Sequence, residues 1–306
     1  MLAHNTVLIQ EAVDALLIKP KGRYVDCTYG RGGHSQAIAD KMDAQGRLLV
    51  IDKDPDAILD AKRRFSQDQR VTIVHGSFVQ IAKHIQKYNM EKVDGILLDL
   101  GVSSPQINSA ARGFSFSKDG PLDMRMNSTQ GISATDWIQK ASEAEIVQVL
   151  RTYGEERFAR RIARKIIEVR TAQKIDRTKL LVQVIESAVP SREYRKHPAT
   201  RSFQAIRIHI NNELDELKGC LADVVDLLAS RGRLVVISFH SLEDRIVKHF
   251  IREMEVGSLP ARLPIPDDKV DRRLKSIGKA TRPSNAEVVG NNRARSAIMR
   301  VAEKTV

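Results

Sequence analysis

The architecture follows from the segment Tyr24-Val-Asp-Cys-Thr-Tyr-Gly-Arg-Gly-Gly-His34 and, further along, from Leu48-Leu-Val-Ile-Asp52. An apolar strand here runs into a glycine-rich turn and a helix, and a second strand then ends in a carboxylate. This order is typical of one strand–helix–strand unit of a nucleotide-binding α/β sheet. The glycines Gly30, Gly32 and Gly33 would let a ligand lie against bare backbone. Asp52 is placed to accept hydrogen bonds from a ribose diol, so we expect an adenosine-type cofactor at this edge.

Short apolar runs and helical patterns alternate through the N-terminal part of the chain. We predict buried parallel strands at Arg23–Cys27, Arg47–Ile51, Val71–Val74 and Val93–Leu98. Between them we predict helices at His34–Met42, Pro55–Phe65 and Phe78–Tyr88. Strands that alternate with helices through short loops indicate the beginning of a doubly wound α/β domain.

The alternation stops after Gly101. Residues 102–127 are rich in Ser, Gly, Asn and Pro and predict a long loop, which in a compact domain is usually functional. Helical patterns follow at Ala134–Ala141, Glu143–Tyr153, Glu155–Arg170 and Lys179–Ala188. The α/β pattern resumes with a helix at Asn211–Ser230, a strand at Arg233–Phe239, a helix at Leu242–Glu255, an extended loop over 256–292 and a last strand at Ser296–Val301. We therefore expect a sheet domain made of residues 1–107 and 209–306, interrupted by an all-helical insert over 108–208.

The composition favours an anionic partner. The chain has 306 residues, a formal net charge of +12 and a sequence pI of about 9.8, which points to nucleic acid or an anionic membrane face; the alternative is an ordinary basic protein. Its two cysteines, Cys27 and Cys220, support neither a disulfide framework nor a thiolate metal site. No basic leader precedes an apolar run near the N-terminus, and no run approaches the ~20 residues of a membrane helix. We expect a cytoplasmic protein without a metal site.

Two cofactor classes compete for the glycine-rich turn. A dinucleotide would require Gly-x-Gly-x-x-Gly, but the third glycine position holds Ser35. Asp26 before the turn would repel a pyrophosphate, whereas it suits a ligand with an ammonium group. Asp99 ends the fourth strand and adds a third carboxylate beside Asp26 and Asp52, because parallel strands end at one edge. This set favours a cation such as S-adenosylmethionine; helix capping by Asp26 or Asp52 is the alternative, and a dinucleotide oxidoreductase stays a competing class.

Motifs along nearly the whole chain resemble one known family. They are Tyr29-Gly-Arg-Gly-Gly-His-Ser35, Asp99-Leu-Gly-Val-Ser-Ser-Pro-Gln106, Arg112-Gly-Phe-Ser-Phe116, Gly120-Pro-Leu-Asp-Met-Arg-Met126, Tyr153-Gly-Glu-Glu-Arg157, His197-Pro-Ala-Thr-Arg201 and Ser238-Phe-His-Ser-Leu-Glu-Asp-Arg245. The family is that of the bacterial 16S rRNA cytosine-N4 methyltransferases (RsmH/MraW). The resemblance implies a class I (Rossmann-like) methyltransferase sheet with a helical insert, S-adenosylmethionine as methyl donor, and a cytosine N4 in the decoding region of the small subunit as acceptor.

The resemblance also implies which residues form the site. The cofactor residues would be Gly32, Gly33, His34, Asp52, Phe78, Asp99 and Gln106. As a hypothesis on the mechanism, we expect Asp99 to hold the donor and Ser104 or its neighbour Ser103, through the hydroxyl or the backbone carbonyl, to meet the acceptor amine. Each assignment has a structural alternative: Phe78 would be a core aromatic, and the serines would shape a turn before Pro105. For His240 we favour a structural role, packed beside a helix that Ser241 caps.

Basic residues gather in three places that an RNA backbone could contact. The first group, in Glu155–Arg170, is Arg157, Arg160, Arg161, Arg164, Lys165 and Arg170. The second is Arg192, Arg195, Lys196, Arg201 and Arg207, and the third is Arg272, Arg273, Lys275, Lys279 and Arg282. We expect the helical insert to recognise 16S rRNA in the small subunit, although such groups can be merely solvated surface. A non-catalytic assembly factor stays an alternative, and a homodimer is left open.

Overall fold

The computed structural model describes residues 6–190, 197–257 and 271–306. The chain forms two compact units. The sheet unit consists of residues 1–101 and 214–306, and the helical unit of residues 102–213. The proposed insert, 108–208, lies within the helical unit. Among the described residues, no helix combines the length and the apolar character needed to cross a membrane.

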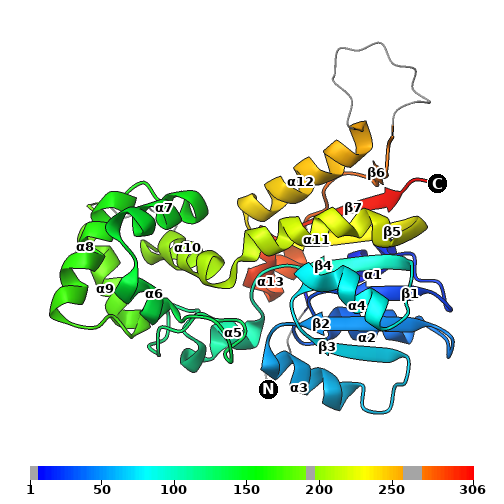
Figure 1. The fold of residues 1–306 in the computed structure, drawn as a ribbon, viewed down its shortest axis with the longest axis horizontal. Coiled ribbons are helices and arrows are strands. Elements are labelled where there is room, and N and C mark those ends of the chain that lie inside the picture. Colours follow the sequence, from blue (N-terminus) through cyan, green and yellow to red (C-terminus); the bar gives the residue numbers. More distant parts are fainter. Residues whose placement is uncertain (1–5, 191–196, 258–270) are drawn as a thin grey trace, which may run out of the picture. The chain divides into compact units, whose positions relative to one another are not determined.

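Within its described residues, the sheet unit is built on seven strands with helices between them (Figure 1). The strands are β1 (Arg23–Asp26), β2 (Arg47–Asp52), β3 (Val71–His75), β4 (Val93–Asp99), β5 (Leu228–Ser238), β6 (Leu274–Ser276) and β7 (Ile298–Lys304). The helices are α1 (Ile9–Ala15), α2 (Gly33–Asp40), α3 (Pro55–Arg64), η1 (Phe78–Gln80), α4 (Ile81–Lys87), α11 (Glu213–Leu227, whose first residue belongs to the helical unit), α12 (Ser241–Val256), α13 (Asn285–Gly290) and η4 (Asn292–Ser296).

The strand order β3-β2-β1-β4-β5-β7-β6 confirms the predicted fold class. Strands β1 to β5 run parallel, whereas β7 is antiparallel to β5 and β6. The order reverses beside β1, so β1 and β4 flank the switch point where ligands of open α/β sheets bind. The central strands are fully apolar over several residues because both of their faces are covered.

Two apolar layers hold the sheet between its helices. Val25, Leu49 and Ile96 pack with side chains of α4, α11 and α12 on one face. Tyr24 and Leu48, one residue away along their strands, pack with α1, α2 and α3 on the other face. Alternate residues of a strand point to opposite faces, so the same apolar runs supply both layers. This packing makes the carboxyl edge of the sheet a rigid support.

The helical unit has its own core. Its elements are α5 (Ser104–Asn108), η2 (Ala110–Arg112), α6 (Ala134–Lys140), α7 (Glu143–Gly154), α8 (Ala159–Ala172), α9 (Thr178–Ala188) and α10 (Ala199–Asn211). Helix α7 packs against α8 and α10, and α8 packs against α9. Trp137, Ile162 and Phe203 are among the buried side chains of this core. The predicted all-helical character of the segment is confirmed for the residues described.

The helices of this unit differ from the prediction at two places, one a shifted boundary and the other a helix that was not predicted. The helix predicted from Glu155 begins instead at Ala159, because Glu155 adopts a left-handed conformation (φ 49°) and ends α7. Glu156 then accepts a hydrogen bond from the Phe158 amide and holds the turn between the two helices. Helix α10 was not predicted, although its buried Phe203 and Ile206 follow helical spacing; the charges of this segment obscured the pattern.

Three further predictions need correction. The supposed loop after Gly101 contains α5, and the supposed extended loop over 256–292 contains β6 and α13. Strand β5 begins at Leu228 rather than Arg233, because a register irregularity against β4 and a positive φ at Arg231 allow the strand to start before Gly232. These elements are short or irregular, so hydrophobic periodicity carries little signal for them.

Candidate functional site

The glycine-rich turn after β1 is fastened to the neighbouring strand β2. The Tyr29 amide donates to the Ile51 carbonyl at 3.1 Å, and the Gly30 amide donates to Oδ2 of Asp52 at 2.8 Å. Gly30 (φ 57°) and Gly32 (φ 71°) have left-handed backbone conformations, which favour glycine. Gly32 is the N-cap of α2. The turn therefore presents the N-terminus of a helix at the carboxyl edge of the sheet.

The protein itself fills the space beside two of these glycines. A Cβ atom on Gly32 would lie 2.5 Å from the ring of Tyr29, and one on Gly33 would lie 1.8 Å from Oγ1 of Thr6. The Tyr29 hydroxyl in turn donates to Asp60 of α3 at 2.6 Å. The sequence interpretation explained these glycines by the close approach of a ligand. In the structure, the side chains of Tyr29 and Thr6 make the close approach that requires glycine. Contact of Gly32 and Gly33 with a cofactor stays a prediction.

Asp26 and Asp52 both face the turn. Asp26 is 1% exposed and accepts hydrogen bonds from Ser35 Oγ at 2.5 Å and from the Thr28 amide at 3.1 Å. Asp52 accepts from the amides of Gly30 and Asp54, both at 2.8 Å. Burial raises the pKa of each carboxyl group to about 6, and the hydrogen bonds oppose that rise. Both acids shape the turn, while each oxygen of Asp52 keeps a second lone pair.

Asp99 is the least satisfied acid of this edge. Its amide donates to Thr28 Oγ1 at 2.6 Å, and its Oδ2 lies 3.6 Å from Nδ1 of the buried His34. Its Oδ1 is buried and has no hydrogen-bond partner within the described part of the chain. Burial raises the pKa of Asp99 to about 8, the charge of Asp26 adds to the rise, and Arg293 opposes it. A cation placed here would recover the missing interaction and lower the pKa of Asp99.

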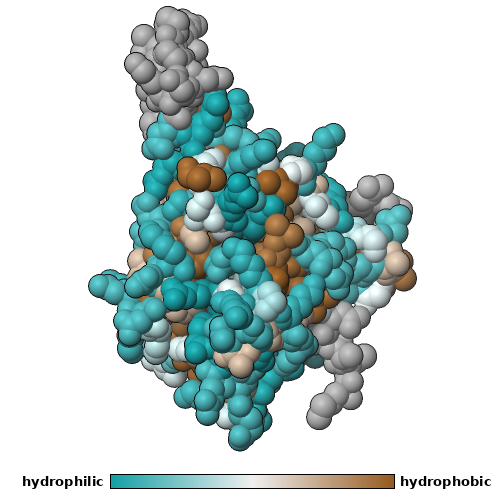
Figure 2. Space-filling model, turned by 90° about the vertical axis from the view of Figure 1, so that its right-hand side faces the viewer, coloured by the Kyte–Doolittle hydropathy of each residue, from teal (hydrophilic) through white to brown (hydrophobic). Residues whose placement is uncertain are grey.

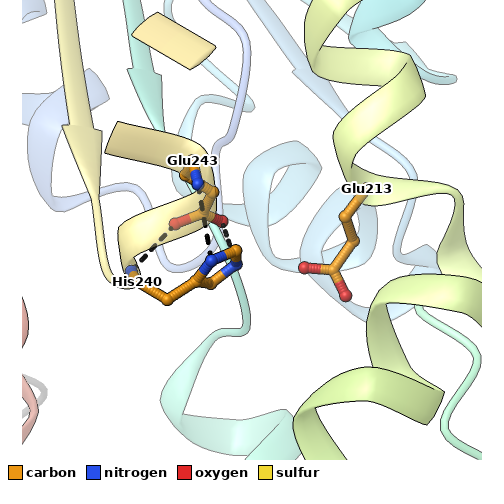
Figure 3. Close-up of side chains that lie close together, drawn as sticks. All are labelled: Glu213, His240 and Glu243. Carbon is orange, nitrogen blue, oxygen red and sulfur yellow. Dashed lines mark hydrogen bonds and ion pairs between the residues drawn. The ribbon is translucent and has the colours of Figure 1, made fainter. Parts of the chain in front are cut away.

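His240 and Glu243 close the edge at the start of α12 (Figure 3). His240 is the N-cap, with Nδ1 accepting from the Glu243 amide at 3.4 Å. The Glu243 carboxylate accepts from the Phe239 amide at 2.8 Å and the His240 amide at 3.3 Å. The prediction that Ser241 caps this helix is therefore wrong by one residue, because His240 is the cap and Ser241 is the first residue of α12. The structural role favoured for His240 is what the geometry shows.

The remaining predicted site residues belong partly to the sheet unit and partly to the helical unit. Phe78 begins η1 in the sheet unit and is half-buried against the layer beneath α4 and α11. Ser104 and Gln106 belong to α5 of the helical unit. Gln106 is 5% exposed, and its Oε1 accepts from the Ser103 amide at 2.8 Å in a capping box. Ser103 and Gln106 thus shape a helix start, and the roles of Phe78, Ser104 and Gln106 toward ligands stay predictions.

The predicted RNA-contacting residues divide into free and engaged groups. Arg157, just before α8, and Arg160, Arg161 and Arg164 on α8 are exposed. Arg170 instead donates to the carbonyls of Ile138 and Ala141. Arg207 forms a bidentate ion pair with Glu213, which is the third residue labelled in Figure 3. Arg273 pairs with Asp226. Arg192, Arg195 and Lys196 lie outside the described residues.

Sequence reasoning missed several residues that shape this edge. Thr28 Oγ1 accepts a hydrogen bond from the Asp99 amide. Near Asp99, Glu243 adds negative charge and Arg293 of η4 adds positive charge. Thr6 packs on Gly33 from the N-terminal segment. Thr28 lies within the quoted turn and Glu243 within a quoted motif, so both could have been considered. No local pattern indicates that Arg293 and Thr6 approach the turn.

The fold and the edge define a class of protein. A doubly wound sheet with a glycine-rich first turn at its switch point binds nucleotide-like ligands. Three carboxyl groups along the same edge, that of Asp26 buried and the other two partly buried, make this example suited to a positively charged ligand, since each would be stabilised as a carboxylate by a nearby cation.

The chain belongs to the MraW methylase family, whose sequence model matches residues 1–305. Two Coxiella burnetii proteins named ribosomal RNA small subunit methyltransferase H, from strains RSA 331 and CbuG_Q212, are each 52% identical to it over 305 residues, covering 99% of both chains. An rRNA methylase structure from Streptococcus thermophilus is 10% identical with a TM-score of 0.43, over 99% of this chain and 100% of that one.

Proposed function

We propose that the protein transfers a methyl group from S-adenosylmethionine to the exocyclic N4 of a cytosine in the decoding region of 16S rRNA. Membership of a methylase family supports methyl transfer. Relatives at 52% identity that are named small-subunit rRNA methyltransferases support the substrate class. The motif resemblance supports cytosine N4. The structural observation that carries the proposal is the Asp99 carboxyl group, whose buried Oδ1 lacks a hydrogen-bond partner in the described structure.

The residues of this edge fit S-adenosylmethionine as cofactor. When bound, it supplies a methyl group activated by a positively charged sulfur. Its sulfonium and ammonium charges match the acidic edge, and its ribose hydroxyls match the unused lone pairs of Asp52. The residues proposed to hold it are Gly32, Gly33, His34, Asp52, Phe78, Asp99 and Gln106.

The protein's part in the reaction is mainly alignment. The amine of cytosine is a weak nucleophile because its lone pair is delocalised into the ring, so holding it in line with the donor supplies much of the rate enhancement. Asp99, once ionised, stabilises the positive charge beside it. The hydroxyl of Ser104 is proposed to accept a hydrogen bond from N4, which localises the lone pair. A paired base hides N4, so the enzyme acts on an unpaired or extruded cytosine.

Methyl transfer to defined RNA tests this proposal. The purified protein is incubated with labelled S-adenosylmethionine and, in parallel, with free 16S rRNA, assembling particles and mature small subunits from cells that lack the gene. Mass spectrometry of the nucleosides should show N4-methylcytidine in at least one substrate. Label on another atom or base would refute the N4 assignment. RNA binding without transfer would favour an assembly factor, and nicotinamide binding would favour an oxidoreductase. We propose a cytoplasmic location, in keeping with this substrate.

A further inference from the structure

We propose that a groove on the sheet unit binds backbone phosphates of the RNA substrate; this inference rests on the proposed function. The groove lies between α12 and the turn that connects β6 to the segment before α13. It encloses a cavity of about 340 Å³. Its polar lining includes Lys248, Arg252, Lys279, Glu255 and Arg300.

The lining carries cations that the protein does not neutralise. Lys248, Arg252 and Lys279 are exposed, and within the described ranges none of them forms a hydrogen bond or ion pair. Arg300 is engaged by Asp244, at 2.7 and 3.0 Å. The carboxylate of Glu255 accepts hydrogen bonds from the amide and hydroxyl of Ser276, at 3.0 and 2.9 Å. Its charge offsets one of the three unpaired cations, so the lining keeps an excess of positive charge.

The arrangement of these cations suits a polyanion. Lys248 and Arg252 are four residues apart on α12, so they project from the same face with about 6 Å of helix axis between them. Like charges at this spacing repel, and neighbouring phosphates would relieve the repulsion. Between them the floor is apolar: Ile251 is buried, and Val256 at the groove's end is 54% exposed. An apolar floor accommodates sugar and base surfaces while the cations meet phosphates.

The strand register places the groove near the candidate site. Asp99 pairs with Ile237 of β5, and Ile237 pairs with Met299 of β7. Adjacent strands are about 4.8 Å apart, so Met299 lies roughly 10 Å from Asp99 across the sheet. Arg300 and Val301, the next residues of β7, line the groove and lie one and two residues further from the carboxyl edge than Met299, because β7 is antiparallel to β5. The groove therefore extends away from the carboxyl edge, and RNA held there would span a few nucleotides to present a base to Asp99.

A charge-matched comparison tests the groove. The triple variant Lys248→Ala, Arg252→Ala, Lys279→Ala is compared with Lys21→Ala, Lys62→Ala, Lys83→Ala, which removes three exposed lysines elsewhere in the same unit. Fluorescence anisotropy with a labelled 16S rRNA fragment from the decoding region is measured from 0.1 to 0.4 M KCl. Three lost contacts should flatten the slope of log K against log salt by about 2 and lower affinity at 0.1 M salt about 100-fold.

The other readouts separate binding from folding and from function. The groove variant should retain its affinity for S-adenosylmethionine in calorimetry and its kcat at saturating RNA, while KM for RNA rises. A groove variant with the same affinity and salt slope as the control would overturn the inference and leave the proposed function intact. If the wild type binds the fragment through the groove but transfers no methyl group to any rRNA, the proposed function fails and the phosphate site stands.

Discussion

Replacing Asp99 by asparagine should stabilise the sheet unit and at the same time weaken cofactor binding. In the unfolded chain an aspartate has a pKa near 3.9, whereas burial raises that of Asp99 to about 8. The folded protein therefore retains a proton that the unfolded chain loses. The stability contribution of Asp99 is fully present below about pH 4 and is lost as pH rises through 8. Asparagine carries no such penalty.

The size of the effect follows from the shift. Four pKa units correspond to an upper limit of about 5 kcal/mol. The Asp99 side chain is 24% exposed, so solvent screens part of this. We expect Asp99→Asn to be about 2–3 kcal/mol more stable than wild type above pH 8 and nearly equal to it at pH 4. Urea titrations across this range measure the difference, with Asp223→Asn on α11 as control. A difference that does not grow with pH would contradict the assigned burial of the carboxyl group.

The same substitution should change the number of protons released when S-adenosylmethionine binds. At pH 7 a group with a pKa of about 8 is about nine-tenths protonated, so a bound cation that ionises Asp99 expels close to one proton. Calorimetry of S-adenosylmethionine binding in buffers of different ionisation enthalpy measures this number. In Asp99→Asn the release should largely vanish, and affinity should fall about 10- to 100-fold with the loss of a charged contact. Unchanged affinity together with no proton release in the wild type would refute the role of Asp99.

Three other substitutions probe separate parts of the molecule. Asp52→Ala should weaken S-adenosylmethionine binding at least tenfold in calorimetry, because a charged acceptor for the ribose is lost; wild-type affinity would exclude the ribose role. Arg160→Glu with Arg164→Glu should reduce rRNA affinity more than about tenfold at 0.1 M salt and leave cofactor affinity intact; if RNA binding is unaffected, α8 is not an RNA surface. Gly33→Ala should lower stability by about 1–2 kcal/mol because its Cβ meets Thr6; thermal unfolding should show recovery when Thr6→Gly is added, and no recovery would place the strain elsewhere.

Local patterns predicted much of the sheet unit. The apolar runs around Val25, Leu49 and Ile96 located three central strands to within a residue or two, since a strand buried on both faces leaves a continuous hydrophobic signature. The start of the helix at Pro55 was also predicted from local sequence, by a proline that follows an aspartate. In the structure Asp54 caps α3 by accepting a hydrogen bond from the Asp56 amide. Short elements such as β6 were not predicted, because three residues carry no measurable hydrophobic periodicity.

The site divides in the same way. Sequence alone determined that Asp26, Asp52 and Asp99 end parallel strands and so share one edge, because strand direction and spacing suffice for that conclusion. Only the tertiary structure decided what each carboxyl group does there. Two of them tie the turn together through hydrogen bonds, whereas burial and the charges of Asp26 and Glu243 raise the pKa of Asp99 and Arg293 opposes that rise. Desolvation and charge depend on which distant segments pack against a group, and that information is spread along the whole chain.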